Sequence, residues 1–186
     1  MSKAATETRN TKATRWAIDP AHSTVEFTVR HMMIARVRGR FAGLEATVIE
    51  AVDPMASRVE AVIQVASIDT GDEKRDAHLR SADFFDAENH PEIRFRSTAL
   101  EPTGDDRFEL AGELTIRGVT RAVTLDVTEE GRATDPWGSE RVGYSARARI
   151  NRKDFGLEWN VALETGGFLV GDEIDIQIEA EAVLQD

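Results

Sequence analysis

Cysteine is missing from this chain of 186 residues. Its absence excludes a disulfide framework, a thiolate nucleophile and a cysteine-ligated metal. Long apolar runs are missing too, since no stretch approaches the ~20 residues that cross a bilayer as a helix. Positive charge is scarce, because 23 basic residues against 34 acidic ones leave a net charge of −11. Phosphate contacts need a basic face, so this balance disfavours nucleic acid as the main partner.

Sequence motifs of catalysis and phosphate binding are also absent. There is no G-x-S-x-G elbow, no P-loop and no G-x-G-x-x-G fingerprint. The four histidines, His22, His31, His78 and His90, follow one another at intervals of 9, 47 and 12 residues. Zinc ligands usually come in spacings as short as H-x₃₋₅-H. The sequence therefore predicts no metal and no cofactor.

The chain is predicted to form one domain after a short leader. Residues 1–14 are small, polar and mixed in charge, which is typical of a disordered segment. They lack the apolar stretch of ~7–15 residues found in a secretory signal, so we expect a cytoplasmic protein. Residues 15–184 contain no repeat or composition break and are numerous enough to bury a core.

Alternation of apolar and polar residues dominates this domain. Val25, Phe27 and Val29 form one apolar row, and similar rows recur, for example in residues 108–116 and 174–178. Such rows predict half-buried strands, about eight or nine in all, separated by turn signals. The resulting class is all-β, mainly an antiparallel meander. Single-sided strands in this number must close into a barrel or a two-sheet sandwich.

A few segments break the alternation. Residues 72–81 predict a helix capped by Asp72, and residues 32–35 predict a shorter helical turn. Residues 161–170 are apolar and glycine-rich, as in a loop or bulged strand near a ligand or a neighbouring chain. Residues 30–41 place four arginines beside two methionines. That basic spot is either a solvated turn with snorkelling arginines or an anion site.

Residues 76–95 hold two histidines, five acidic residues and the pair Phe84-Phe85. An acid/base centre built on His78 and Asp83 is one interpretation. In the other, both rings pack down after a short helix as a lid over an apolar interior. The same rings could also simply plug one end of a filled core.

Four segments, in order, resemble the signatures of a known family. They are "WAIDPAHSTVEFTVRHMMIARVRGRF" (16–41), "DAHLRSADFFDAENHPEIRFRST" (76–98), "GELTIRGVTRAVTLDV" (112–127) and "INRKDFGLEWN" (150–160). Together they are similar to the YceI-like family of polyisoprenoid-binding proteins, and the resemblance covers about residues 15–184. It implies a lipocalin-like antiparallel β-barrel with a long apolar cavity. Family members are often dimers, and many are secreted into the periplasm by a signal peptide.

The resemblance and the residue patterns together predict a carrier for an extended amphiphile. Polyprenyl phosphates, isoprenoid quinones and fatty-acyl compounds are the ligand classes that the family implies. Eight strands suit a barrel that encloses one small ligand. The predicted cavity residues, taken from the apolar rows and the flanking turns, are Phe27, Val29, Met32, Met33, Phe41, Ile63, Val65, Phe84, Phe85, Phe95, Leu114, Ile116, Phe155, Leu157 and Trp159.

Polar residues receive narrower roles. Arg36, Arg38 and Arg40 are the candidate partners of an anionic head group, because guanidinium suits phosphate. His78 is predicted to be a hydrogen-bonding strut. The family motif implies a pair between Arg152 and Asp154 that fixes a strand end.

Two alternatives stay open at this stage. One is an enzyme, a hydrolase or isomerase that uses a histidine and a carboxylate inside the barrel on an apolar substrate. The other is a filled barrel that acts through protein contacts. A homodimer is compatible with each of them.

Overall fold

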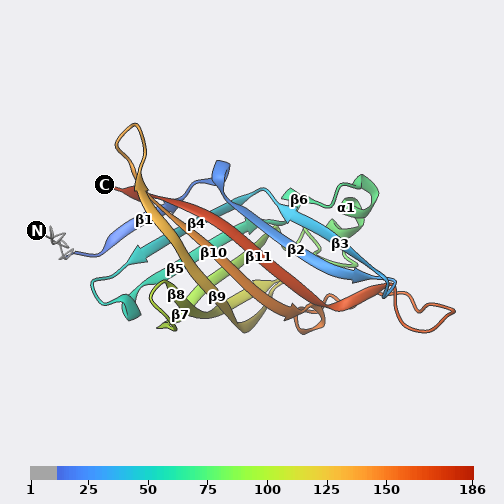
Figure 1. The fold of residues 1–186 in the computed structure, drawn as a ribbon. Coiled ribbons are helices and arrows are strands. Elements are labelled where there is room, and N and C mark those ends of the chain that lie inside the picture. The colour runs from blue at the N-terminus through green and yellow to red at the C-terminus, as the bar shows by residue number, and fades with distance from the viewer. Residues whose placement is uncertain (1–11) are drawn as a thin grey trace, which may run out of the picture.

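The computed structural model describes residues 12–186, so residues 1–11 of the predicted leader lie outside the described residues. Figure 1 shows the chain as a barrel of long, strongly twisted strands. The strands are β1 (Thr14–Ile18), β2 (Thr24–His31), β3 (Ala35–Phe41), β4 (Leu44–Glu50), β5 (Arg58–Gln64), β6 (Ile68–Asp69), β7 (Glu92–Pro102), β8 (Arg107–Ile116), β9 (Val119–Thr134), β10 (Glu140–Asn151) and β11 (Val170–Gln185). One α-helix, α1 (Glu73–Arg80), and four 3₁₀ turns, η1 (Pro20–His22), η2 (Pro54–Ala56), η3 (Val65–Ser67) and η4 (Arg152–Phe155), complete the described elements.

The sheet closes on itself. Its order is β1-β4-β5-β7-β8-β9-β10-β11, and β11 also pairs with β1. Every pairing is antiparallel, so these eight strands form a closed barrel without an unpaired edge. Strands β2, β3 and β6 extend one end of the wall, because β2 continues along β11 beyond β1. The predicted all-β, lipocalin-like class is confirmed.

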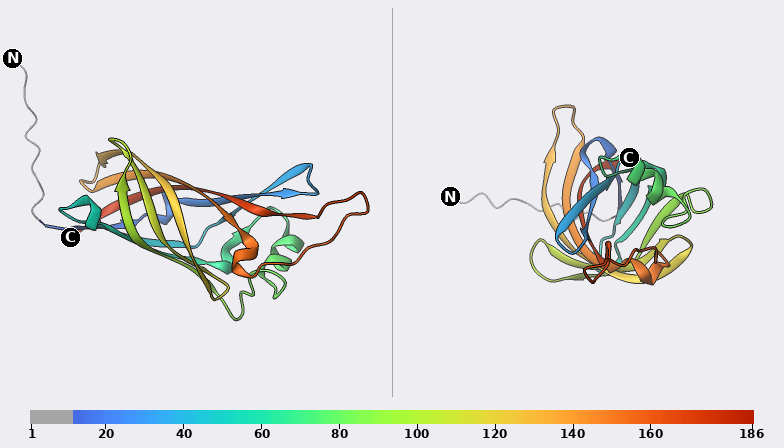
Figure 2. Two further views of the ribbon diagram at one scale, coloured as in Figure 1. Left: turned by 90° about the horizontal axis from the view of Figure 1, so that it is seen from below. Right: turned by 90° about the vertical axis from the view of Figure 1, so that its right-hand side faces the viewer.

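The barrel has two differently built ends. Both chain ends of the described region lie near one of them, whereas α1 and η4 lie at the other (Figures 1 and 2). Nine buried apolar residues form the main core cluster, against which Leu79 of α1 and Phe85 pack. A smaller cluster of Trp16, Val142 and Ala182 lies where β1 closes on β11.

Helix α1 is attached to the barrel by polar contacts. Asp72 caps it by accepting hydrogen bonds from the Lys74 and Arg75 amides, which confirms the predicted cap. The buried carboxylate of Asp76 accepts from the amide and hydroxyl of Thr70 at 2.9 and 2.6 Å. These bonds hold the helix over the barrel end. Among the described residues, no helix has the length and apolarity needed to cross a membrane.

The predicted helical turn at residues 32–35 is wrong. Residues 32–34 instead form the tight turn between β2 and β3, with Met32 and Met33 in the left-handed region at φ 51° and 62°. Left-handed turn residues suit the twist of a hairpin. Residues 161–169 form the predicted loop, narrowed by a bridge between Ala162 and Phe168.

Candidate ligand-binding cavity

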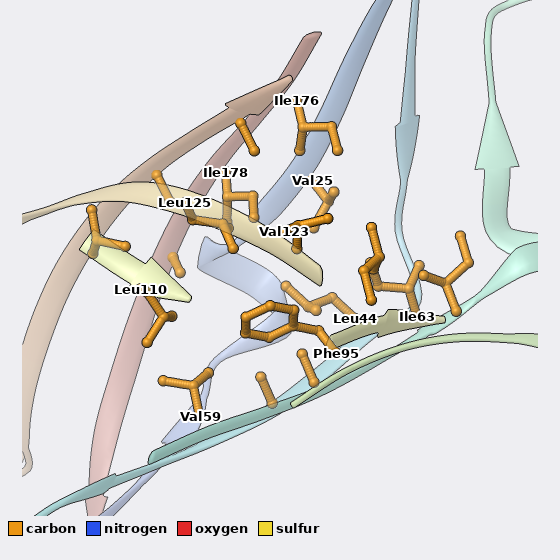
Figure 3. A pocket seen from close by; sticks show the side chains of 18 of the residues that line it. Val25, Leu44, Val59, Ile63, Phe95, Leu110, Val123, Leu125, Ile176 and Ile178 are labelled. Carbon is orange, nitrogen blue, oxygen red and sulfur yellow. The ribbon is translucent and has the colours of Figure 1, made fainter. Parts of the chain in front are cut away.

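A cavity of about 370 Å³ lies inside the barrel. Its wall is built from the inward-facing residues of the strands, which Figure 3 shows pointing into one common space. Val25, Leu110 and Ile178, for example, meet there from β2, β8 and β11. A pocket of this size is typical of a small-molecule site, which spans roughly 300–1,000 Å³. The interior is therefore not completely filled by side chains.

Most of the predicted cavity residues line this space. They are Phe27, Val29, Phe41, Ile63, Phe84, Phe85, Phe95, Leu114, Ile116, Phe155 and Leu157. The period-two rows that identified most of them are the rows that face inward. Their contact with a ligand stays a prediction.

Four predicted residues lie elsewhere. Val65 belongs to η3, where the strand has ended, and is buried in the core instead. Trp159 packs against the rings of His78 and Phe84, with centroids 4.6 and 5.3 Å away. Met32 and Met33 lie at the exposed tip of the β2–β3 hairpin.

Two glycines make room for aromatic rings in the wall. Gly39 on β3 lies directly opposite Phe27 on β2, and a Cβ atom at Gly39 would collide with the Phe27 ring. Gly112 on β8 lies diagonally across from Phe95 of β7, and a Cβ atom there would likewise collide with the Phe95 ring. The rings thus lie close to the wall, where larger residues at these positions would displace them into the cavity.

The end of the cavity under α1 and η4 is called the closed end below. Arg152, which is only 4% exposed, lies in its wall. Its guanidinium donates to the carbonyls of Leu157 at 2.6 Å, Gly171 at 2.8 Å and Trp159 at 3.0 Å. Burial lowers the pKa of Arg152, whereas Asp172, 3.6 Å away, acts in the opposite direction.

The implied pair between Arg152 and Asp154 is wrong. Asp154 is exposed and forms no ion pair among residues 12–186. Arg152 instead donates to backbone carbonyls of the loop before β11 and of the first residues of β11. It therefore fixes the path of that loop rather than one neighbouring side chain.

Phe84 and Phe85 cover the closed end, in agreement with the lid interpretation. Phe84 is buried and its ring lies 5.1 Å from the ring of His78. His78 Nε2 lies 2.8 Å from Asp83 Oδ2, on a partly exposed outer face. Neither His78 nor Asp83 lines the cavity, and no other histidine among the described residues does so. The enzyme alternative required a histidine inside the barrel, and this arrangement does not provide one.

The opposite end of the cavity is lined by charged residues and is called the charged end below. Glu50 occupies the last inward position of β4, after Leu44, Ala46 and Val48. Arg132 Nη2 lies 2.8 Å from Glu50 Oε1, and its Nε lies 2.7 Å from a Glu129 oxygen. The other Glu50 oxygen accepts from the Trp16 indole at 3.0 Å.

The charged end carries net negative charge. Burial alone would raise the pKa of Glu50, but the hydrogen bonds and charge of Arg132 outweigh it, and the pKa is lowered. Glu129 and Glu50 in turn raise the pKa of Arg132. Two carboxylates therefore surround one guanidinium. Burial also raises the pKa of Tyr144 to about 12, so its hydroxyl stays protonated at neutral pH.

Sequence reasoning missed this group. Its members come from β1, β4, β9 and β10, and Glu50 and Arg132 are 82 positions apart in the chain. The available signal was a carboxylate at an inward position of an apolar row, which is costly unless it is paired.

The predicted head-group arginines do not reach the cavity. Arg36, Arg38 and Arg40 are exposed on the outer face of β3, whose inward positions are Val37, Gly39 and Phe41. Arg40 instead pairs with Asp69 at 3.2 Å. The structure therefore does not place these guanidinium groups in the cavity wall, and their contact with a ligand head group stays a prediction.

One cluster of residues resembles a metal site in its ligand types. Ligand atoms of Asp19, His22 and Glu181 lie within 4.8 Å of one another. Arg141 also contacts both carboxylates. The His22 hydrogen bond, followed by the Arg141 bond, lowers the pKa of Asp19 to about 2. Arg141 bridges the two carboxylates and offsets part of their charge, so this cluster is an ion-pair network of the barrel wall.

A closed eight-stranded antiparallel barrel around one apolar cavity is the architecture of lipocalin-like binding proteins. Residues 16–182 match the model of the YceI-like domain. The chain therefore belongs to the YceI-like family, as its four motifs predicted.

Relatives and solved structures agree with this membership. Protein YceI from Escherichia coli O17:K52:H18 is 36% identical over 165 residues, which cover 88% of this chain and 83% of that protein. Burkholderia cenocepacia BcnA superposes with a TM-score of 0.75 at 26% identity, over 88% of this chain and 98% of that one. A polyisoprenoid binding domain from Saccharophagus degradans, implicated in plant cell wall breakdown, has a TM-score of 0.68 over 91% and 98%. At 16% identity, the last comparison shows the fold alone.

Proposed function

We propose that this protein binds and carries a lipid with an extended apolar tail inside the barrel. The observation that carries the proposal is the cavity, whose wall is formed by apolar rows from strands around the whole barrel. Burying each CH₂ group of a tail stabilises a complex by roughly 0.8 kcal/mol. A tail of moderate length therefore offsets the cost of ordering it. The name of the Saccharophagus degradans domain supports an isoprenoid as the tail.

The residues of the charged end limit which class of ligand head group can bind there. Glu50 and Glu129 outnumber Arg132, and all three line the cavity. An anionic phosphate there would face two carboxylates at short range, which is unfavourable in a partly buried site. The protonated Tyr144 hydroxyl can donate a hydrogen bond to a carbonyl oxygen. Among the predicted ligands, an isoprenoid quinone or a fatty-acyl compound thus suits this end better than a polyprenyl phosphate.

Native mass spectrometry on protein purified without detergent, followed by organic extraction, tests the proposal. The expected result is a stoichiometric adduct of isoprenoid, quinone or fatty-acyl mass. Protein with no adduct and no uptake of added quinone or polyprenol would contradict it and would favour a barrel that acts through protein contacts. The predicted cytoplasmic location and homodimer are not part of this test and stay predictions.

A further inference from the structure

Two segments project together beyond the closed end of the barrel: the turn between β2 and β3, and the loop of residues 161–169 (Figure 2). The Met32 amide donates to the Leu169 carbonyl at 2.8 Å, so the two segments are joined. Met33 also packs directly on Gly167. They present one continuous surface, called the apolar tip here. Its exposed apolar residues are Met32 (42%), Met33 (60%), Ile34 (83%), Val161 (46%) and Phe168 (56%).

The apolar tip is bordered by cations. Residues 30–41 contain four arginines and no acidic residue, although the whole chain carries a charge of −11. Arg30 and Arg36 lie directly opposite each other on β2 and β3, and Arg38 follows. Like charges in such a cross-strand position repel each other. None of these three arginines forms an ion pair among residues 12–186. A counter-charge from outside the molecule would relieve this repulsion.

The turn η4 adds another cation beside an aromatic ring of the loop. Lys153 Nζ lies 5.9 Å from the centroid of the Phe168 ring and 3.1 Å from Asp172. Glu164 is the one acidic residue between Val161 and Phe168. Arg36 and Arg38 also border a surface hollow that contains Glu26 and Asp175. The hairpin of residues 30–41 itself carries four arginines and no acidic residue, which distinguishes it from the molecule as a whole.

We propose that the apolar tip and the arginines Arg30, Arg36 and Arg38 dock the protein on a bilayer that contains anionic phospholipids. Apolar side chains at the end of a projecting hairpin can enter the interface, while adjacent arginines meet lipid phosphates. The hairpin and the loop extend beyond the barrel end (Figure 2), so they can reach a bilayer before the rest of the molecule does. Because the rest of the chain is acidic, an anionic bilayer would repel the other faces and select this orientation.

Vesicle co-sedimentation with the full chain tests this docking. The probes are vesicles of phosphatidylcholine alone and of phosphatidylcholine with one quarter phosphatidylglycerol, at 0.1 M salt. We expect binding only to the anionic vesicles. The triple variant R30Q/R36Q/R38Q should bind about 100-fold more weakly, since each juxtamembrane arginine contributes roughly a factor of 5. The double variant M33S/I34S should lose at least about 10-fold through reduced apolar insertion.

Matched controls separate position from composition. R58Q/R107Q/R121Q makes the same charge change at other exposed arginines, and V52S/M55S removes two other exposed apolar side chains, at the charged end. Both controls should keep more than about half of the wild-type vesicle binding. Equal losses in controls and tip variants, or equal binding to both kinds of vesicle, would overturn the proposal. So would a wild-type protein that ignores vesicles but self-associates in sedimentation velocity, with M33S/I34S abolishing that association.

Discussion

An arginine lies at each end of the apolar cavity, and the two arginines have different kinds of hydrogen-bond partner. At the closed end, Arg152 is almost completely buried and is held by backbone carbonyls. At the charged end, Arg132 remains partly exposed and is held by Glu50 and Glu129. Carbonyl partners do not titrate, whereas carboxylate partners do. The first arrangement is suited to structure, and the second leaves a polar site that a ligand head group can reach.

The largest expected effect concerns Arg152 at the closed end. The R152M variant keeps the volume but leaves the carbonyls of Leu157 and Gly171 without their donor. We expect the free energy of unfolding to fall by about 3–5 kcal/mol, as measured by urea denaturation. R149M, which changes an exposed arginine near the end of β10, just before η4, should cost less than about 1 kcal/mol. A loss of that small size for R152M would mean that Arg152 does not hold the loop.

The carboxylates of the charged end should determine head-group preference. We expect wild-type protein to bind a neutral polyprenol at least about 10-fold more tightly than the polyprenyl phosphate of equal length. Removing both charges in E50Q/E129Q should abolish most of this difference, as measured by tryptophan quenching. The variant E45Q/E109Q changes exposed carboxylates outside the cavity and should keep the difference. Tighter binding of the phosphate by wild-type protein would contradict the assignment.

Acid should loosen the charged end first. The pKa values of the partly shielded Glu50 and Asp135 are lowered in the folded protein, and that of Asp19 is lowered to about 2. The pKa values of Asp69 and Asp72 beside α1 are lowered too, but these carboxylates are more exposed and contribute less. A lowered pKa stabilises the fold above the unfolded value near 4, and this contribution is lost as pH falls toward the folded value. With 5-fluorotryptophan, the native ¹⁹F signal of Trp16 should therefore disappear at a higher pH than that of Trp159, between pH 5 and 2.5. Simultaneous loss would indicate that the two ends unfold as one unit.

The smallest expected effect is at Asp154, whose pairing with Arg152 is not observed. Because its carboxylate is exposed and unpaired among the described residues, D154A should change the free energy of unfolding by less than about 0.5 kcal/mol. D154A and R152M change two residues of the same sequence motif, and we expect only R152M to lower the free energy of unfolding substantially. If urea denaturation of D154A showed the free energy of unfolding to fall by about 2 kcal/mol or more, an ion pair between Asp154 and Arg152 would be supported after all.

Local patterns account for what could be predicted. Inward rows such as Phe27 and Val29 follow from alternation alone, and Asp72 precedes its helix with a cap signal. The same alternation that turns Phe41 inward turns Arg38 and Arg40 outward, so their placement could have been predicted correctly. Alternation had been used only to place the apolar residues of β3, and the arginines between them had not been assigned to a face.

Contacts between distant residues account for the rest. The carbonyl partners of Arg152 depend on how the loop before β11 returns to the wall, and no local pattern encodes that path. Glu50 and Arg132 are 82 positions apart in the chain, and only the closed barrel brings β4 and β9 close enough for them to pair. Met32 and Met33 adopt left-handed backbone conformations, but the turn sequence contains neither of the residues, glycine and asparagine, that usually signal such a turn.

The most direct measurement is ligand uptake by a variant whose cavity is filled. Ala148 on β10 lines the cavity, so A148W should occupy the space that a tail requires, whereas R147W places the same ring outside the barrel. Titration with a neutral polyprenol, followed by native mass spectrometry, should give stoichiometric binding for wild type and R147W and at least about 10-fold weaker binding for A148W. Equal binding by A148W and R147W, with both variants folded, would contradict a ligand site inside the barrel.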